Sequence, residues 1–181
     1  LFFFSGPVSG SGVSDEASSD LFNRAVALYE GGSFDESVNL VNQFLITDGE
    51  NASALNLKGL ILMKSGAYKD AEKKFLKALN FSEKKPMTYY NLGLNSFNHG
   101  YMDDADRYFT LARAGDNLSF GLLFYSGLVK YALGSYDEAV LLLNEASEKN
   151  PDDPATWFNL GMSYEQVRKF DLAVKAYDNA I

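Results

Sequence analysis

The side chains that enzymes use for covalent, acid–base or metal chemistry are scarce in this sequence. There is no cysteine, which excludes disulfides, thiolate metal sites and cysteine nucleophiles. The one histidine, His99, falls near the end of a predicted helix, where we expect it to pack or to interact with the helix terminus rather than act as a catalytic base. No phosphate-binding P-loop and no nucleophile elbow occur, and Asp48-Gly49-Glu50 does not fit a calcium loop. We therefore expect no catalytic residue, no metal and no cofactor, and we predict that the chain is not an enzyme.

Asparagine is the chemically useful side chain that recurs at a regular spacing. Asn23, Asn91 and Asn159 follow one another at steps of 68 residues (91 − 23 and 159 − 91). An asparagine amide donates and accepts hydrogen bonds at once, so asparagines spaced along one face could hold an extended peptide backbone without reading its side chains. The alternative is a solvated side chain, or a hydrogen bond from one helix to the next.

The elements that must position these asparagines are set by a repetition of half that step. Four series of small residues and one series of bulky apolar residues recur every 34 residues. The members are Gly59, Gly93, Gly127 and Gly161; Ala71, Ala105, Ala139 and Ala173; Ala78, Ala112, Ala146 and Ala180; Gly32, Gly66, Gly100 and Gly134; and Val41, Phe75, Phe109, Leu143 and Tyr177. Self-similarity at this period is typical of arrays of helix–turn–helix units.

The period divides the chain into five units after a flexible N-terminal segment at residues 1–17. The units are a divergent first repeat at 18–51, then repeats at 52–85, 86–119 and 120–153, and a fifth at 154–181 that is cut off inside its second helix.

Each unit reads as two amphipathic helices. In the fourth unit we predict helices over 121–133 and 137–148, separated by Gly134-Ser135. The glycine that ends each first helix is expected in the left-handed conformation, and acids such as Asp137 open the second helices near the positive end of the dipole. Gly127 leaves no side chain where the two helices cross, so the cost of a glycine within a helix indicates that packing requires it.

The fifth unit carries a known motif. Trp157, Leu160, Gly161 and Tyr164 match the W-x2-L-G-x2-Y run of the tetratricopeptide repeat family, which the sequence resembles over everything after the N-terminal segment. The resemblance implies an all-α fold, a right-handed α-solenoid of about five helix–turn–helix repeats. It also implies that the first helix of each unit lines a concave groove that binds a protein or peptide.

Transferred position by position, the resemblance implies which side chains line this groove. The partner-binding residues expected in it are Asn23, Asn56, Leu60, Met63, Tyr90, Asn91, Leu94, Phe97, Phe124, Tyr125, Leu128, Tyr131, Phe158 and Asn159.

The predicted helix that begins at Phe120 is apolar on nearly every face, although a helix in a two-layer stack should keep one polar face. Phe124, Leu128 and Tyr131, together with Tyr90 and Phe97, would then form an exposed patch of the kind that anchors partners. Additional helices, or contact with another copy of the chain, are the alternative cover for this patch.

Composition narrows the choice of partners. Sixteen Lys and Arg against 24 Asp and Glu give a net charge of −8, which makes nucleic acid a poor candidate because its phosphates would be repelled. Leu1–Phe4 is an apolar tip on a Ser- and Gly-rich tether. It is consistent with a disordered terminus, with a segment that lies in an apolar groove, or with the end of a signal peptide or membrane anchor preceding residue 1. The compartment, cytoplasmic or exported, stays open.

Three hypotheses for function follow. The first is a non-catalytic protein–protein interaction scaffold that binds a partner peptide or protein segment in the concave groove. The second is a self-assembling structural module that forms homo-oligomers, and the third is the docking or regulatory region of a larger enzyme. Fold class alone does not decide between them.

Overall fold

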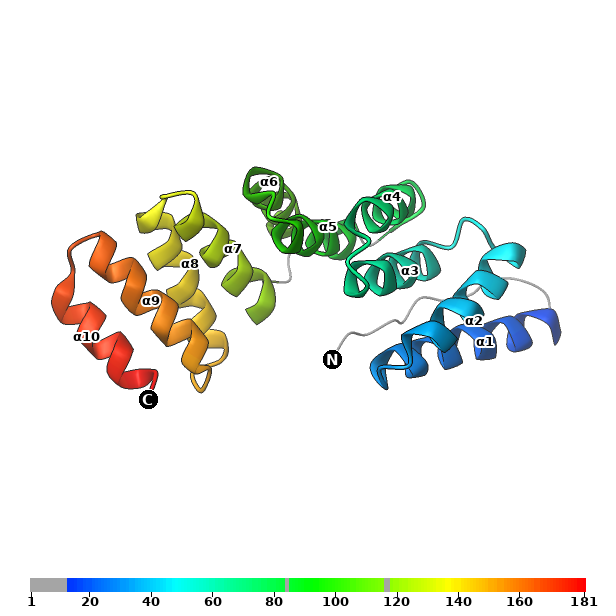
Figure 1. Cartoon of the computed structure of the whole chain (residues 1–181), viewed down its shortest axis with the longest axis horizontal. Helices are drawn as coiled ribbons and strands as arrows, with labels where there is room; N and C mark the ends of the chain where they lie inside the picture. Colours follow the sequence, from blue (N-terminus) through cyan, green and yellow to red (C-terminus); the bar gives the residue numbers. More distant parts are fainter. Residues whose placement is uncertain (1–12, 84, 116–117) are drawn as a thin grey trace. The chain divides into compact units, whose positions relative to one another are not determined.

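The computed structural model describes residues 13–83, 85–115 and 118–181, and over these residues it consists of ten α-helices joined by short turns, without a strand (Figure 1). The helices are α1 Val13–Glu30, α2 Phe34–Thr47, α3 Ala52–Lys64, α4 Tyr68–Leu79, α5 Lys85–His99, α6 Met102–Arg113, α7 Phe120–Ala132, α8 Tyr136–Lys149, α9 Pro154–Gln166 and α10 Phe170–Asn179. None of these ten, taken over the described ranges, combines the length and apolar character of a bilayer-spanning helix.

The predicted all-α fold is confirmed. In the fourth unit, α7 and α8 each end within one residue of the helices that the sequence predicts. Acidic side chains lie in the first turn of every second helix, as expected from the helix dipole.

The N-terminal segment differs from expectation at its end. Residues 13–17, predicted to be flexible, belong to α1. Asp15 and Glu16 fall in the first turn of this helix, where negative charge favours helix formation, and that signal outweighs the preceding serines and glycines. The predictions made for Leu1–Phe4 lie outside the described residues.

The chain divides into two compact units, and the division falls inside α5, between Asn91 and Leu92. In the first unit, α1, α2 and α3 share a core of Ala25, Val41, Leu57 and Ile61. In the second unit, one core cluster joins α8, α9 and α10, and another joins α7 and α8. The half-buried ring of Phe124 packs against both clusters of the second unit.

The glycines within the first helices lie where each crosses its second helix. A Cβ added to Gly59 would lie 2.4 Å from Cε1 of Phe75, and one added to Gly93 would lie 2.4 Å from the ring of Phe109. The equivalent distances for the other two helix glycines are 2.6 Å from Gly127 to Leu143 and 2.5 Å from Gly161 to Tyr177. The predicted reason for these glycines is confirmed, since a methyl group would overlap the side chain that fills each crossing.

The turn glycines adopt the left-handed conformation that the sequence predicts. Gly32, Gly66, Gly100 and Gly134 have φ between 76° and 85°. In the fourth turn, the N–H of Gly134 donates to Tyr131 O at 3.0 Å and the N–H of Ser135 donates to Lys130 O at 2.9 Å. These two bonds satisfy carbonyls at the end of the helix.

Arg168 occupies the corresponding position in the fifth turn, with φ 59°. It makes the same pair of bonds, because its N–H donates to Glu165 O at 3.0 Å and the N–H of Lys169 donates to Tyr164 O at 2.9 Å. A side chain with a Cβ is strained in this conformation.

We expect Arg168→Gly to raise the free energy of unfolding by about 1 kcal/mol, because glycine relieves the strain at a smaller entropic cost. Gly134→Ala is the matched reverse change, since no atom lies within 4 Å of an added Cβ there and only the backbone conformation is tested. It should lower the free energy by about 1 kcal/mol. Urea denaturation followed by circular dichroism measures both, and equal stability of Arg168→Gly and the parent chain would contradict the assignment of strain.

Candidate partner-binding surface

The predicted groove residues of the first unit are largely interior. Leu60 and Met63 in α3 are 5% and 8% exposed, and Asn56 and Asn91 are also buried. Tyr90 is half-buried, and Asn23 in α1 is exposed. The burial of these four side chains differs from the exposure expected of groove residues, so we leave them out of the surface proposed below.

A hydrogen-bond network explains why two asparagines are tolerated inside. Asn56 Nδ2 donates to Ala52 O and to Thr88 Oγ1, both at 3.0 Å, and Asn56 Oδ1 accepts from Asn91 Nδ2 at 3.4 Å. A buried amide without such partners would be costly. The helix-to-helix alternative therefore describes Asn91, and Thr88, a fully buried member that sequence reasoning missed, gives no periodic signal of its own.

The three spaced asparagines do not share one environment. Asn159 Nδ2 donates to Ala155 O of its own helix at 2.7 Å, whereas Asn23 is exposed and Asn91 is buried. The idea of an asparagine ladder that holds a peptide backbone stays a prediction, and the surroundings of the three amides give it no common geometry.

Aromatic side chains of the second unit form a continuous row. The ring centroids of Phe97 and Tyr125 are 5.4 Å apart, those of Tyr125 and Phe124 are 5.4 Å apart, and those of Phe124 and Phe120 are 5.7 Å apart. The first two contacts are edge-to-face, a favoured arrangement of aromatic pairs. We call Phe97, Tyr125, Phe124 and Phe120 the aromatic row. Phe120 was absent from the predicted residues, although the apolar character of its helix was the signal that could have found it.

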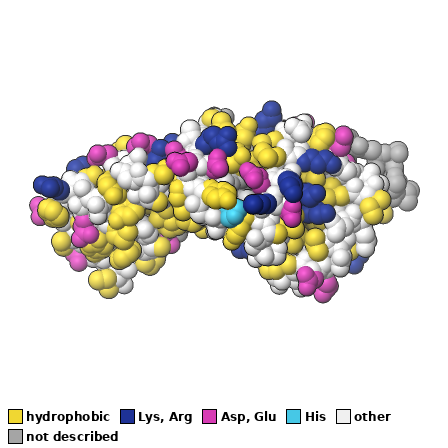
Figure 2. All heavy atoms as spheres, turned by 45° about the horizontal axis from the view of Figure 1, so that its top comes forward, with side chains coloured by type: hydrophobic (Ala, Val, Ile, Leu, Met, Phe, Trp, Pro, Cys, Tyr) yellow, Lys and Arg dark blue, Asp and Glu magenta, His cyan; other side chains and the backbone are white. Residues whose placement is uncertain are grey.

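Further apolar side chains extend this row along the same face. Leu128 and Tyr131 follow Phe124 at intervals of four and seven residues on α7, so all three share one side of the helix. Phe158, which is 52% exposed, occupies in α9 the position that Phe124 occupies in α7, and Leu94 in α5 corresponds to Leu128. On the face shown in Figure 2, hydrophobic side chains gather over the second unit at the left of the view.

We call the aromatic row together with Leu94, Leu128, Tyr131 and Phe158 the apolar face. The side chains of the row are half-buried, so they expose part of each ring while the rest is fixed in the core. Phe158 contacts Tyr177 with ring centroids 5.7 Å apart, and Tyr131 contacts Tyr136 at 5.3 Å. The face is therefore preorganised by contacts to the second helices.

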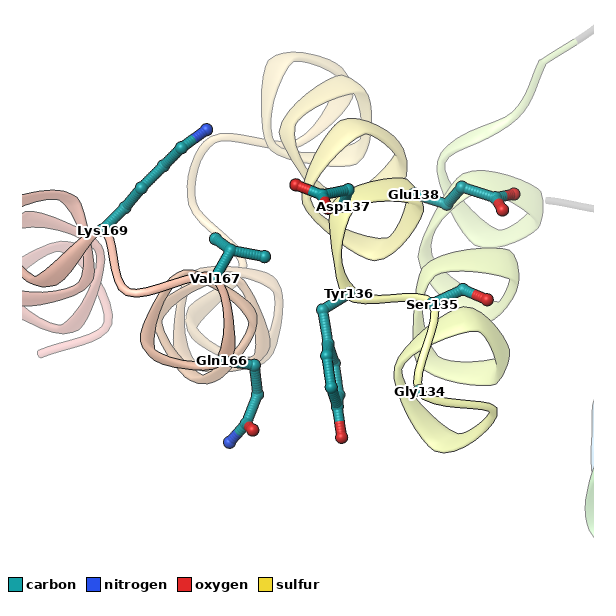
Figure 3. Close-up of a pocket in the computed structure, with 8 residues that line it drawn as sticks. All are labelled: Gly134, Ser135, Tyr136, Asp137, Glu138, Gln166, Val167 and Lys169. Carbon is teal, nitrogen blue, oxygen red and sulfur yellow. The ribbon is translucent and has the colours of Figure 1, made fainter.

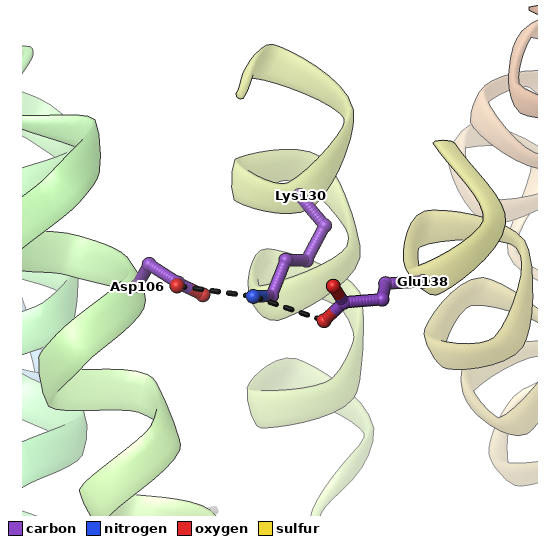
Figure 4. Close-up of polar contacts among 3 residues, drawn as sticks. All are labelled: Asp106, Lys130 and Glu138. Carbon is purple, nitrogen blue, oxygen red and sulfur yellow. Dashed lines mark hydrogen bonds and ion pairs between the residues drawn. The ribbon is translucent and has the colours of Figure 1, made fainter. Parts of the chain in front are cut away.

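An ion-pair network fixes α7 between its neighbours. Lys130 Nζ lies 3.0 Å from Asp106 Oδ2 in α6 and 3.0 Å from Glu138 Oε2 in α8 (Figure 4). Burial disfavours the charged lysine, but its hydrogen bonds to Glu138 and Asp106 and their negative charges outweigh this and raise the pKa of Lys130. The lysine is charged at neutral pH and holds three helices together.

The best-formed hollow of the described chain lies elsewhere. It opens between the turn that leads into α8 and the end of α9 (Figure 3). Its lining residues are Gly134, Ser135, Tyr136, Asp137, Glu138, Gln166, Val167 and Lys169, none of which is a predicted site residue. Figure 3 shows Tyr136 and Gln166 extending on one side of it and Lys169 on the other.

No catalytic or metal chemistry emerges from the described residues. In those ranges, no group of three or more His, Asp and Glu side chains could hold a metal ion. His99 packs against Tyr101 with ring centroids 4.2 Å apart, at the end of α5, which is the role predicted for it.

Paired helices at a period of 34 residues, with glycine at each crossing and aromatic side chains on the first helices, define a helical-repeat protein of the interaction-scaffold class. The chain belongs to the tetratricopeptide repeat family: profiles described as tetratricopeptide or TPR repeat match residues 22–86, 127–167 and 154–181.

Two curated proteins are similar in sequence. The TPR repeat-containing protein MJ1428 of Methanocaldococcus jannaschii is 29% identical over 73% of this chain and 23% of its own length. A probable UDP-N-acetylglucosamine–peptide N-acetylglucosaminyltransferase SPINDLY of Hordeum vulgare is 24% identical over 89% of this chain and 18% of its own. The chain thus spans less than a quarter of the length of either relative.

Solved structures share the fold at lower identity. YrrB, described as a TPR protein with an unusual peptide-binding site, superposes with a TM-score of 0.74 and 22% identity over 89% of this chain and 83% of its own. PilF of Pseudomonas aeruginosa gives a TM-score of 0.81 and 17% identity over 92% and 76%, respectively. MamA gives 0.76 and 23% over 86% and 91%. These likenesses show the fold.

Proposed function

We propose that this protein is a non-catalytic scaffold that docks an apolar segment of a protein partner on the apolar face of α5, α7 and α9. The observation that carries the proposal is the aromatic row, whose rings are locked edge to face while part of each stays accessible. Rigid aromatic anchors are enriched among the residues that dominate binding energy at interfaces. Preorganisation also lowers the entropic cost of binding.

The composition of the face predicts what the partner offers. It presents rings and a leucine, and its charged neighbour Lys130 is already neutralised by Asp106 and Glu138. We therefore expect a ligand with two or more bulky apolar side chains rather than a charged tail. The solved neighbour YrrB, whose description names a peptide-binding site, supports a peptide as the form of ligand.

A peptide selection tests this proposal. Random peptides displayed on phage are selected against the chain, and the tightest is synthesised with a fluorophore for anisotropy titration. Phe158→Ser, at the exposed end of the face, should weaken binding by about tenfold, the loss expected from removing one anchor. Leu141→Ser is the matched control, because Leu141 is 64% exposed but lies on the second helix α8. It should leave the affinity unchanged.

Equal losses in the two variants would mean that the peptide does not use the apolar face. Light scattering of the same samples adds a second readout. A parent chain that self-associates, together with a monomeric Phe158→Ser variant, would instead assign the face to homo-oligomer formation.

A larger enzyme that contains this scaffold is the second candidate function. The favouring observation is the similarity to a probable glycosyltransferase, of which this chain matches 18% of the length. In that case the docked segment would be a substrate. Immunoblotting for the native protein measures its mass: a mass near 20.0 kDa, that of the chain, would dismiss this candidate.

A further inference from the structure

Positive charge is concentrated in one stretch of this acidic chain. Residues 58–85 hold eight of the 16 Lys and Arg but three acids, so the stretch has a net charge of +5, whereas the whole chain has −8. The remaining residues therefore carry −13 (−8 − 5). The lysines are Lys58, Lys64, Lys69, Lys73, Lys74, Lys77, Lys84 and Lys85.

The fold gathers several of these lysines on α4. Lys69, Lys73 and Lys77 are spaced by four residues and are exposed, so they form a stripe along one side of the helix. The residues that α4 buries, Ala71 and Phe75 among them, lie on its other side. Figure 2 shows Lys and Arg side chains gathered over the first unit at the right of the view.

Little of this charge is neutralised. Lys73 pairs with Asp70 at 2.9 Å, but both side chains are well exposed and such pairs are weak. Lys77 Nζ donates to the backbone oxygen of Gly49 at 3.0 Å, and that acceptor is neutral. Within the described residues, Lys74 forms no ion pair.

Lys58 on α3 adds to the same charge. Its Nζ donates to Asn42 Oδ1, again a neutral acceptor. Partial burial and the nearby positive charge of Lys74 lower the pKa of Lys58. Two lysines are thus held close enough to repel each other, and an anion placed beside them would relieve that repulsion.

We propose that Lys58, Lys69, Lys73, Lys74 and Lys77, the basic face of α3 and α4, bind an Asp- and Glu-rich segment of a protein partner. This surface lies in the first unit and is distinct in chemistry and position from the apolar face. Charge complementarity favours a short acidic segment, which meets the lysines locally. An extended polyanion, a nucleic acid or an anionic membrane, would also meet the acidic remainder of the chain and be repelled by it.

A labelled peptide of ten glutamates is the probe, with a peptide of ten glutamines as its uncharged counterpart. Fluorescence anisotropy should show binding of the glutamate peptide alone, weakening as salt is added. The double variant K58Q/K74Q should lose about tenfold in affinity, because it removes the two closest charges. K149Q/K175Q makes the same change of net charge in the second unit, at exposed lysines, and should lose less than about twofold.

Circular dichroism checks that each variant is folded. Should K58Q/K74Q fail to fold, K69Q/K77Q replaces exposed lysines of the same face and carries the same expectation. Equal losses in the two units would overturn the proposal, as would equal binding of the glutamine peptide. It is also overturned if phosphatidylserine vesicles bind and the peptide does not, or if the lysines serve self-association alone, seen as a concentration-dependent mass that K58Q/K74Q abolishes without peptide binding.

Discussion

Alanine in place of Gly59 is expected to lower the free energy of unfolding by about 2 kcal/mol, although alanine is the better helix former by about 1 kcal/mol. The added methyl would lie 2.4 Å from the ring of Phe75, a distance that forces the ring or the helix to move. Overpacking of this kind costs about 1–3 kcal/mol or more, which exceeds the gain in helix propensity. Urea denaturation followed by circular dichroism gives the value.

An unchanged or higher stability of Gly59→Ala would show that the crossing of α3 and α4 is looser than described. The same substitution at Gly93, with its added Cβ 2.4 Å from Phe109, repeats the test in the second unit. Agreement between the two sites would establish that the spacing of the repeat encodes one packing rule.

Removing the ring itself should have the larger effect. Phe75 is 0% exposed, so Phe75→Ala is expected to lower the free energy of unfolding by about 3–5 kcal/mol through lost burial and a cavity. Leu76 is the next residue of the same helix and is 42% exposed. Leu76→Ala is the matched control and should change stability by about 0.5 kcal/mol or less. Similar losses at the two positions would contradict the burial of Phe75.

The double variant separates packing from helix propensity. Once Phe75→Ala has removed the ring, Gly59→Ala no longer meets an obstacle and should become stabilising by about 1 kcal/mol. The sign of the glycine substitution is thus expected to depend on its neighbour. Effects that simply add would mean that the two residues do not interact.

The helix pairs were predictable because the sequence repeats their packing requirements. Glycine recurs 16 residues before each bulky side chain, as in Gly59 and Phe75, so one physical cause acts at four crossings. The start of α1 was less predictable, since the serines and glycines that precede it carry no helical period. The strain at Arg168 was visible as a missing glycine, and its φ of 59° confirms that the turn kept its shape without one.

The candidate surface was predicted in part. The apolar character of α7 indicated the aromatic row, whose ring contacts follow from helix register. The burial of Asn56 and Asn91 could not be predicted, because it depends on Thr88 meeting them from another helix. The lysines of α3 and α4 were visible in the sequence, but the net charge of the whole chain hides a local excess of opposite sign.

The order in which helices contact one another bears on how fast this chain reaches its structure. Among the described helices, each contacts helices that are one or two places away along the chain. The loops that must close are therefore short, and little entropy is lost before a contact rewards it. Proteins with such sequence-local contacts fold rapidly, and a repeat array can begin to fold at any of its helix pairs. Synthesis on the ribosome can therefore proceed with each hairpin folding as it emerges, without waiting for distant parts of the chain.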